Sequence, residues 1–108
     1  MADQKDNQDP YKVPKGTRIG HVHLKVSELA RSLRFYQDLL GFQITQQYGD
    51  QAVFLASGDY HHHLALNTWQ SLGAPPAPKR SAGLFHLAIL YPTEEALAGI
   101  FKRLREAD

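Results

Sequence analysis

Residues 20–42, GHVHLKVSELARSLRFYQDLLGF, carry a strand pattern that passes directly into a helix pattern. Over residues 21–26 apolar side chains alternate with polar ones, which is typical of a strand with one packed and one polar face. Ser27 is placed to cap a helix, and Gly41 is placed to end it. The residues between them predict one apolar helical stripe, made by Leu29, Leu33, Tyr36 and Leu40.

The residues that follow this helix predict three more strands. Residues 42–49 and 52–57 have strand patterns and are joined by a turn around Gly49 and Asp50. A second turn at residues 57–59 precedes a run of three histidines and a further alternating segment. Residues 17–70 therefore predict a βαβββ module.

A second, shorter pattern follows a linker. Residues 71–83 are rich in proline and break regular structure. Residues 84–92 predict a fifth strand, and residues 93–108 predict a second amphipathic helix with Thr93 as its cap. Its apolar stripe is expected to comprise Leu97, Ile100, Phe101 and Leu104.

The two halves form a weak internal repeat. His21 precedes the cap residue Ser27 by 6 positions, and His86 precedes the cap residue Thr93 by 7. The fold class predicted from these patterns is α+β: one βαβββ module plus the first strand and helix of a second module. The polar residues 1–16, which lack periodicity, predict a flexible N-terminal arm.

The composition of the 108 residues excludes several classes of protein. The formal net charge of +1 gives no basic excess for binding nucleic acid, and no charge block suggests a membrane surface. No apolar run is long enough to cross a bilayer, and the polar N-terminal sequence is unlike a signal peptide, so we expect a cytoplasmic protein. With no cysteine in the chain, a transition metal would have to be bound by histidine, carboxylate and water.

Strand parity predicts which side chains share a face. In the first strand His21, His23 and Lys25 are expected on the face opposite the helix, because Val22 and Leu24 pack against it. The same rule in residues 84–92 turns His86 to that face, so the repeat-equivalent His21 and His86 are expected to meet in one concavity. A lone strand histidine is also commonly a structural or solvated residue.

The same parity divides the run Tyr60 to Trp69, YHHHLALNTW. It predicts that His62 points away from its neighbours, and that His61 lies near a turn where it contacts water. His63 and Asn67 are the expected pocket residues of this run. Asn67 and Trp69 have a second interpretation, in which they only end the strand and start the linker turn.

Residues 16–108 resemble the vicinal oxygen chelate superfamily of glyoxalases, bleomycin-resistance proteins and extradiol dioxygenases. The motifs SLRFYQDLLGF and YHHHLALNTW carry the resemblance, which is greatest to catechol-2,3-dioxygenase-type proteins. It implies paired βαβββ modules that curl around a divalent metal. In the dioxygenase branch the metal is Fe²⁺, held by two histidines and a glutamate. The resemblance therefore implies Fe²⁺ for this protein, with Mn²⁺, Zn²⁺ and Ni²⁺ as alternatives.

The resemblance also assigns ligands. His21 matches the first-strand histidine of the family and His86 matches the fifth-strand histidine. The third ligand, a glutamate on the eighth strand, has no counterpart before Asp108, so the second module is expected to be incomplete. The glyoxalase branch has a further glutamate on the fourth strand, where this sequence has Ala65 or a close neighbour.

These observations favour a metal-dependent extradiol dioxygenase-like protein that acts on a small catechol-like substrate and is a poor enzyme as this chain alone. His63 or His23 would take the substrate proton, and Asn67 and Trp69 would contact the substrate. A metal-free binding protein of the bleomycin-resistance type and a glyoxalase-like lyase are the alternatives. The unpaired second helix and fifth strand predict a homodimer, with or without strand or domain swapping.

Overall fold

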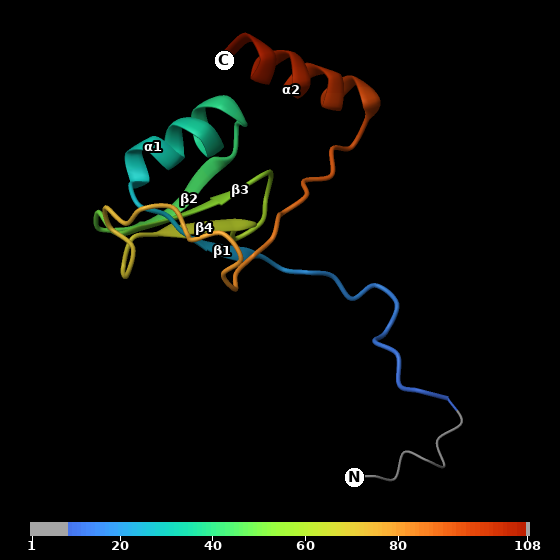
Figure 1. Ribbon diagram of the computed structural model, residues 1–108. Helices are drawn as coiled ribbons and strands as arrows, with labels where there is room; N and C mark the ends of the chain where they lie inside the picture. Colours follow the sequence, from blue (N-terminus) through green and yellow to red (C-terminus); the bar gives the residue numbers. More distant parts are fainter. Residues whose placement is uncertain (1–8, 108) are drawn as a thin grey trace, which may run out of the picture.

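A computed structural model describes residues 9–107 of the chain, and its centre is one mixed sheet of four strands (Figure 1). The strands are β1 (Val22–Lys25), β2 (Gln43–Tyr48), β3 (Ala52–Ala56) and β4 (Leu64–Asn67). Their order across the sheet is β1-β4-β3-β2, with β1 parallel to β4 and the other pairs antiparallel. The predicted α+β module, with its four strands, is confirmed.

The first helix is irregular. It begins as α1 (Leu29–Leu33) and continues as the π-helix η2 (Arg34–Leu39), whose wider turn is closed by a hydrogen bond from Leu40 N to Phe35 O of 2.9 Å. Gly41 ends the helix with a φ of +90°, as its position in the sequence predicts.

Ser27 does not cap this helix, so that prediction is wrong. The residue at the N-cap position is Glu28, and no side chain caps the helix there. The Ser27 hydroxyl instead accepts a hydrogen bond of 2.7 Å from the Arg31 guanidinium one turn further on. A charge-assisted bond to arginine has therefore replaced the weaker bond to a helical N–H.

The core lies between the sheet and this helix. Its buried members are alternate residues of the two central strands: Val53, Leu55, Leu64 and Leu66. Val22 and Leu24 of β1 and the helical stripe residues Leu29, Leu33 and Tyr36 pack against them. The apolar residues of the strands and those of the helical stripe therefore form one apolar layer, as the sequence predicts.

Residues 84–92 do not form the predicted fifth strand. They run beside the sheet toward the C-terminal helix (Figure 1), and within the described part of the chain no strand pairs with them. A strand needs a neighbour to satisfy its backbone groups, so alternation alone does not produce one here. Leu87 packs against the core, whereas Phe85 is 93% exposed and Leu90 is 97% exposed.

The C-terminal helix α2 (Glu94–Ala107) is present and lies beyond η2, away from the sheet (Figure 1). Thr93 caps it as predicted, since its hydroxyl accepts a hydrogen bond of 3.0 Å from Ala96 N. Arg103 joins α2 to the end of η2 by donating to the carbonyl oxygens of Leu39 at 3.0 Å and Asp38 at 2.9 Å.

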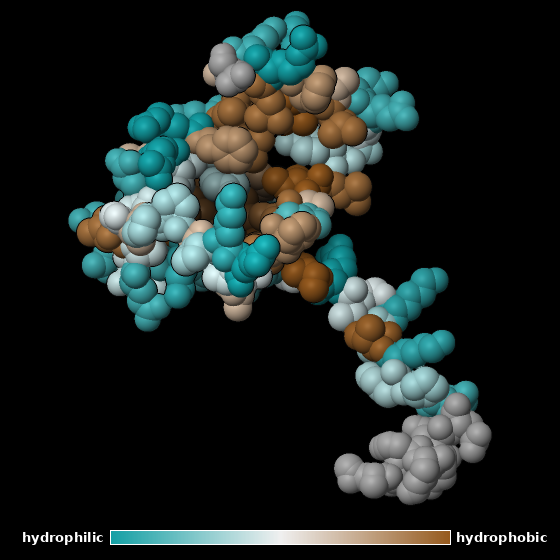
Figure 2. All heavy atoms as spheres, in the orientation of Figure 1, coloured by the Kyte–Doolittle hydropathy of each residue, from teal (hydrophilic) through white to brown (hydrophobic). Residues whose placement is uncertain are grey.

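The apolar face of α2 is only partly covered. Ile100 is its one buried residue among those described, while Leu97 is 54% exposed and Phe101 is 59% exposed. Figure 2 shows brown, apolar side chains on the side of α2 that faces the rest of the molecule, above a hollow. This matches the expectation that the second helix would have few partners.

Outside these elements, residues 9–16 are exposed and lack regular structure, and residues 1–8 of the predicted arm lie outside the described part. Residues 72–83, which make up most of the predicted linker, likewise contain neither helix nor strand. Within residues 9–107 no helix has the length and apolar character needed to cross a membrane.

Truncation of the most enclosed leucine of β4 tests this account of the core. Leu66→Ala should lower the free energy of unfolding by about 2–5 kcal/mol, because it removes a fully buried side chain between two strands and the helix. Urea denaturation followed by circular dichroism measures the change. The matched variant Leu72→Ala, at a leucine that is 77% exposed, should change it by less than about 0.5 kcal/mol. Equal losses in the two variants would contradict the proposed position of the core.

Candidate functional site

The face of the sheet opposite the helix carries imidazole and aromatic rings. On β1, His23 and Lys25 are exposed while Val22 and Leu24 are partly buried, which confirms the parity predicted for this strand. The His23 ring lies 6.2 Å from that of Phe54 in β3 and 5.6 Å from that of Trp69, measured between ring centroids. This open face is therefore lined with flat side chains.

Three histidines meet at one end of this face. The ring centroids of His21 and His62 are 4.3 Å apart, and the Nδ1 atoms of His61 and His62 are 3.0 Å apart. One ligand nitrogen from each of His21, His61 and His62 lies within 4.8 Å of the other two. Among residues 9–107 this is the one group of three or more potential metal ligands.

His62 was predicted to point away from its neighbours, and that prediction is wrong. Its ring contacts Phe54, at 4.8 Å between centroids, on the open face of the sheet. The reason is that β4 begins only at Leu64, so residues 57–63 form a turn in which strand alternation does not apply. His61 lies in this turn and is exposed, as expected, and it also contacts His62 and Tyr60.

Hydrogen bonds hold the turn against β1, the residues just before it, and β2. The Tyr60 hydroxyl donates to the carbonyl oxygen of Gly20 at 3.0 Å, next to His21. Val22 N donates to His63 O at 3.0 Å, and the Thr45 hydroxyl donates to His61 O at 2.6 Å. The backbone on both sides of the His61 and His62 pair is thus fixed to the sheet.

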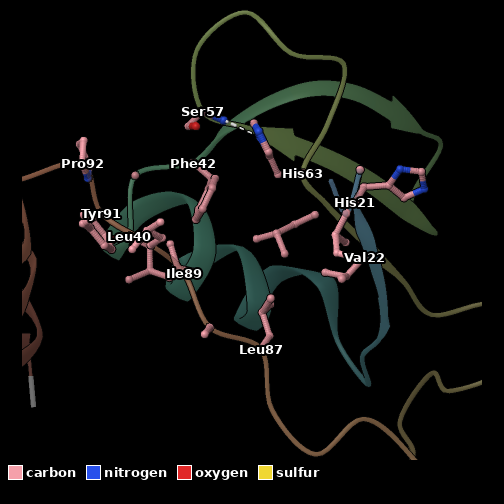
Figure 3. Close-up of a pocket in the computed structure, with 16 residues that line it drawn as sticks. His21, Val22, Leu40, Phe42, Ser57, His63, Leu87, Ile89, Tyr91 and Pro92 are labelled. Atoms are coloured by element: carbon pink, nitrogen blue, oxygen red, sulfur yellow. Dashed lines mark hydrogen bonds between the residues drawn. The ribbon is translucent and has the colours of Figure 1, made fainter. Parts of the chain in front are cut away.

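His63 is turned away from this cluster. Its Nδ1 accepts a hydrogen bond of 3.2 Å from Ser57 N, and the bond is visible in Figure 3. His63 lines a cavity of about 500 Å³, together with His21, Phe42, Leu87 and other mainly apolar residues. In the same view the His21 ring points away from Leu87 and out of that cavity (Figure 3).

Asn67 and Trp69 lie at the other end of β4. Asn67 is buried, and its side-chain oxygen accepts a hydrogen bond of 3.0 Å from Trp69 N. The amide therefore holds the turn after the strand, which agrees with the second interpretation of this pair. The Trp69 ring remains 51% exposed beside His23 and is the part of the pair that a ligand can reach.

His86 lies on the irregular segment 84–92. It is exposed, and its ring packs beside that of Phe85 at 5.3 Å between centroids. It is not a member of the three-histidine group. Joint metal binding by His21 and His86 therefore stays a prediction.

The environment of His62 favours its neutral form. Burial lowers the pKa of His62 below its ordinary value of 6.5, and the neighbouring His21, His61, His23 and His63 lower it further by charge repulsion. A neutral imidazole keeps one lone pair free for a metal or for a hydrogen-bond donor. The three-histidine group could therefore hold a metal ion through its ring nitrogens.

Comparison with known proteins identifies the family. Residues 18–108 match the Glyoxalase/Bleomycin resistance protein/Dioxygenase superfamily. The chain belongs to this superfamily, in agreement with the resemblance noted from its two motifs.

Two curated relatives are dioxygenases by name. The chain is 42% identical over 96 residues to Catechol-2,3-dioxygenase of Bacillus subtilis, a match that covers 88% of this chain and 34% of that protein. It is 30% identical over 89 residues to Biphenyl-2,3-diol 1,2-dioxygenase 3 of Rhodococcus globerulus, covering 82% of this chain and 46% of that protein. The chain thus spans less than half the length of either relative.

Solved structures share the fold. Lactoylglutathione lyase from Agrobacterium tumefaciens superimposes with a TM-score of 0.62 at 18% identity, over 87% of this chain and 72% of that one. A possible glyoxalase from Bacillus cereus gives a TM-score of 0.61 at 22% identity, over 85% of this chain and 75% of that one. These similarities support the glyoxalase-type fold.

Proposed function

We propose that this chain is part of a ring-cleaving dioxygenase whose substrate is a small aromatic diol of the catechol type. The observation that carries the proposal is the 42% identity to a catechol-2,3-dioxygenase over 88% of the chain. The open face lined by His23, Phe54 and Trp69 supports it, since flat rings stack well against such side chains.

In this proposal His21 and His86 are two ligands of a divalent metal, Fe²⁺ first and Mn²⁺, Zn²⁺ or Ni²⁺ otherwise. The set that suits Fe²⁺ in oxygenases is two histidines and one carboxylate. No Asp or Glu side chain joins the histidine group within residues 9–107, so the described residues do not complete that set. The contribution of this chain is then two of the metal ligands, together with the side chains that bind and orient the substrate.

His23 is the residue best placed to take a substrate proton. It is exposed on the same face as the rings of Phe54 and Trp69, and an imidazole nitrogen within reach of a substrate hydroxyl can act as a general base. His63, the other candidate, has its Nδ1 occupied by Ser57 N and faces the apolar cavity. We assign His63 a structural part in holding the turn, and Asn67 a similar part.

Ring cleavage can be tested in a hybrid protein. The chain would replace its matching 96 residues in the Bacillus subtilis relative, and catechol cleavage would be followed by the absorbance of the yellow ring-opened product. We expect cleavage by the hybrid and none by the chain alone. His21→Ala or His86→Ala in the hybrid should lower the rate at least about 100-fold, because loss of a ligand exceeds the effect of losing an outer-shell partner.

The exposed Lys25→Ala substitution, on the same strand, is the matched control for the hybrid. A soluble, folded hybrid that retains full activity after both histidine substitutions would disprove their role as ligands. A folded hybrid without activity would disprove the proposed reaction.

A metal-free binding protein is the second candidate. The aromatic lining of the open face favours it, with Phe54 between the rings of His23 and Tyr48 at 6.2 and 6.0 Å. Such a protein would hold a flat aromatic molecule without changing it. It differs from the dioxygenase in needing no cation.

Trp69 is the only tryptophan of the chain, so its fluorescence reports directly on this face. Catechol should quench it with saturation, and His23→Ala should weaken binding about threefold to tenfold, the value of one aromatic contact. Lys25→Ala is again the control. Binding that persists unchanged with EDTA favours the metal-free protein, whereas quenching without saturation would exclude a catechol site here.

We further propose that the chain forms a homodimer, with or without exchange of strands. The exposed side chains of Leu97 and Phe101 on α2, and the unpaired segment 84–92, are apolar surfaces that a second copy would cover. Light scattering should give twice the monomer mass, and Phe101→Glu should restore the monomer. A monomer of the unsubstituted chain at high concentration would disprove the proposal.

A further inference from the structure

We propose that His21, His61 and His62 form a binding site for one late transition-metal cation, with Zn²⁺ as its first occupant and Ni²⁺ or Cu²⁺ as substitutes. This site shares His21 with the family pair but uses neither His86 nor a carboxylate. It does not depend on the proposed ring cleavage.

The distances allow the three rings to share one ion. Their ligand nitrogens lie within 4.8 Å of one another, and the Nδ1 atoms of His61 and His62 are already 3.0 Å apart. Two nitrogens bound to one tetrahedral Zn²⁺ are separated by about 3.3 Å, given Zn–N bonds of about 2.0–2.1 Å. Small rotations of the three histidine side chains, two exposed and one half-buried, would bring their ligand nitrogens from within 4.8 Å to this separation without a backbone shift.

The backbone holds the three residues ready for this geometry. The Tyr60 hydroxyl ties the histidine turn to Gly20, the neighbour of His21, and Thr45 fixes the His61 carbonyl. The Tyr60 ring also lies 4.2 Å from the ring of His61, which limits the positions that this imidazole can take. A site that is preformed loses less conformational entropy when it binds the ion.

The chemistry of the ligands selects the cation. Imidazole nitrogen suits Zn²⁺, Ni²⁺ and Cu²⁺, whereas Ca²⁺ and Mg²⁺ require oxygen ligands, which the group lacks. Three protein ligands leave a fourth tetrahedral position for water or an anion. The Phe54 ring lies 4.8 Å from that of His62, measured between ring centroids, so the group lies beside an aromatic side chain.

Zn²⁺ titration of the chain, by competition with a fluorescent chelator, tests the site. We expect one Zn²⁺ per chain, and the double variant His61→Asn/His62→Asn should weaken binding on the order of 100-fold, because two of three ligands are lost. Lys25→Ala, at an exposed residue outside the group, should bind as the unsubstituted chain does. Mg²⁺ at equal concentration should not compete.

A result in which His86→Asn loses Zn²⁺ and the double variant keeps it would overturn this site and favour the family pair instead. The readout is metal affinity, so it is independent of whether catechol is cleaved. Because the double variant could unfold, ¹⁵N NMR of the histidine rings in the unsubstituted chain provides a second measurement. Zn²⁺ should shift the nitrogens of His21, His61 and His62, and shifts confined to other histidines would disprove the proposal.

Discussion

The parallel pairing of β1 with β4 is the contact on which both the core and the candidate site depend. Its register sets Val22 opposite Leu64 and Leu24 opposite Leu66, so the apolar residues of both strands face the helix together. Because parallel strands start at the same edge of a sheet, the residues just before each strand also meet there. His21 precedes β1 and the histidine turn precedes β4, and this edge is where the three rings gather.

Strand alternation also gives the two faces of the sheet different chemistry. Alternation sends Val53 and Leu55 of β3 into the core and turns Phe54 to the other side, where it contacts His23 and His62. The substrate and the metal ion that we propose are both placed on the face that the helix does not cover. The cavity on the helix side, which His63 lines, is mainly apolar and is closed in part by residues 87–92.

The C-terminal part of the chain is held by few contacts. Arg103 joins α2 to the last carbonyls of η2, and Leu87 reaches the core, but Leu97 and Phe101 remain largely exposed. Residues 84–92 have a strand pattern and yet lack a neighbour with which to pair within residues 9–107. A strand pattern becomes a strand only when another backbone satisfies its N–H and C=O groups.

The sequence by itself determined the four-stranded module and the face of His23, because these depend on local periodicity. It also determined the helix stop at Gly41 and the cap at Thr93, because these depend on single residues with strong conformational preferences. Only the tertiary structure decided that His62 joins His21. Alternation holds within a strand and fails in the turn before β4, and the direction of a turn side chain is set by long-range hydrogen bonds such as Tyr60 to Gly20. The cap role of Ser27 was lost to Arg31 for a similar reason, since a competing side chain decides which partner a hydroxyl takes.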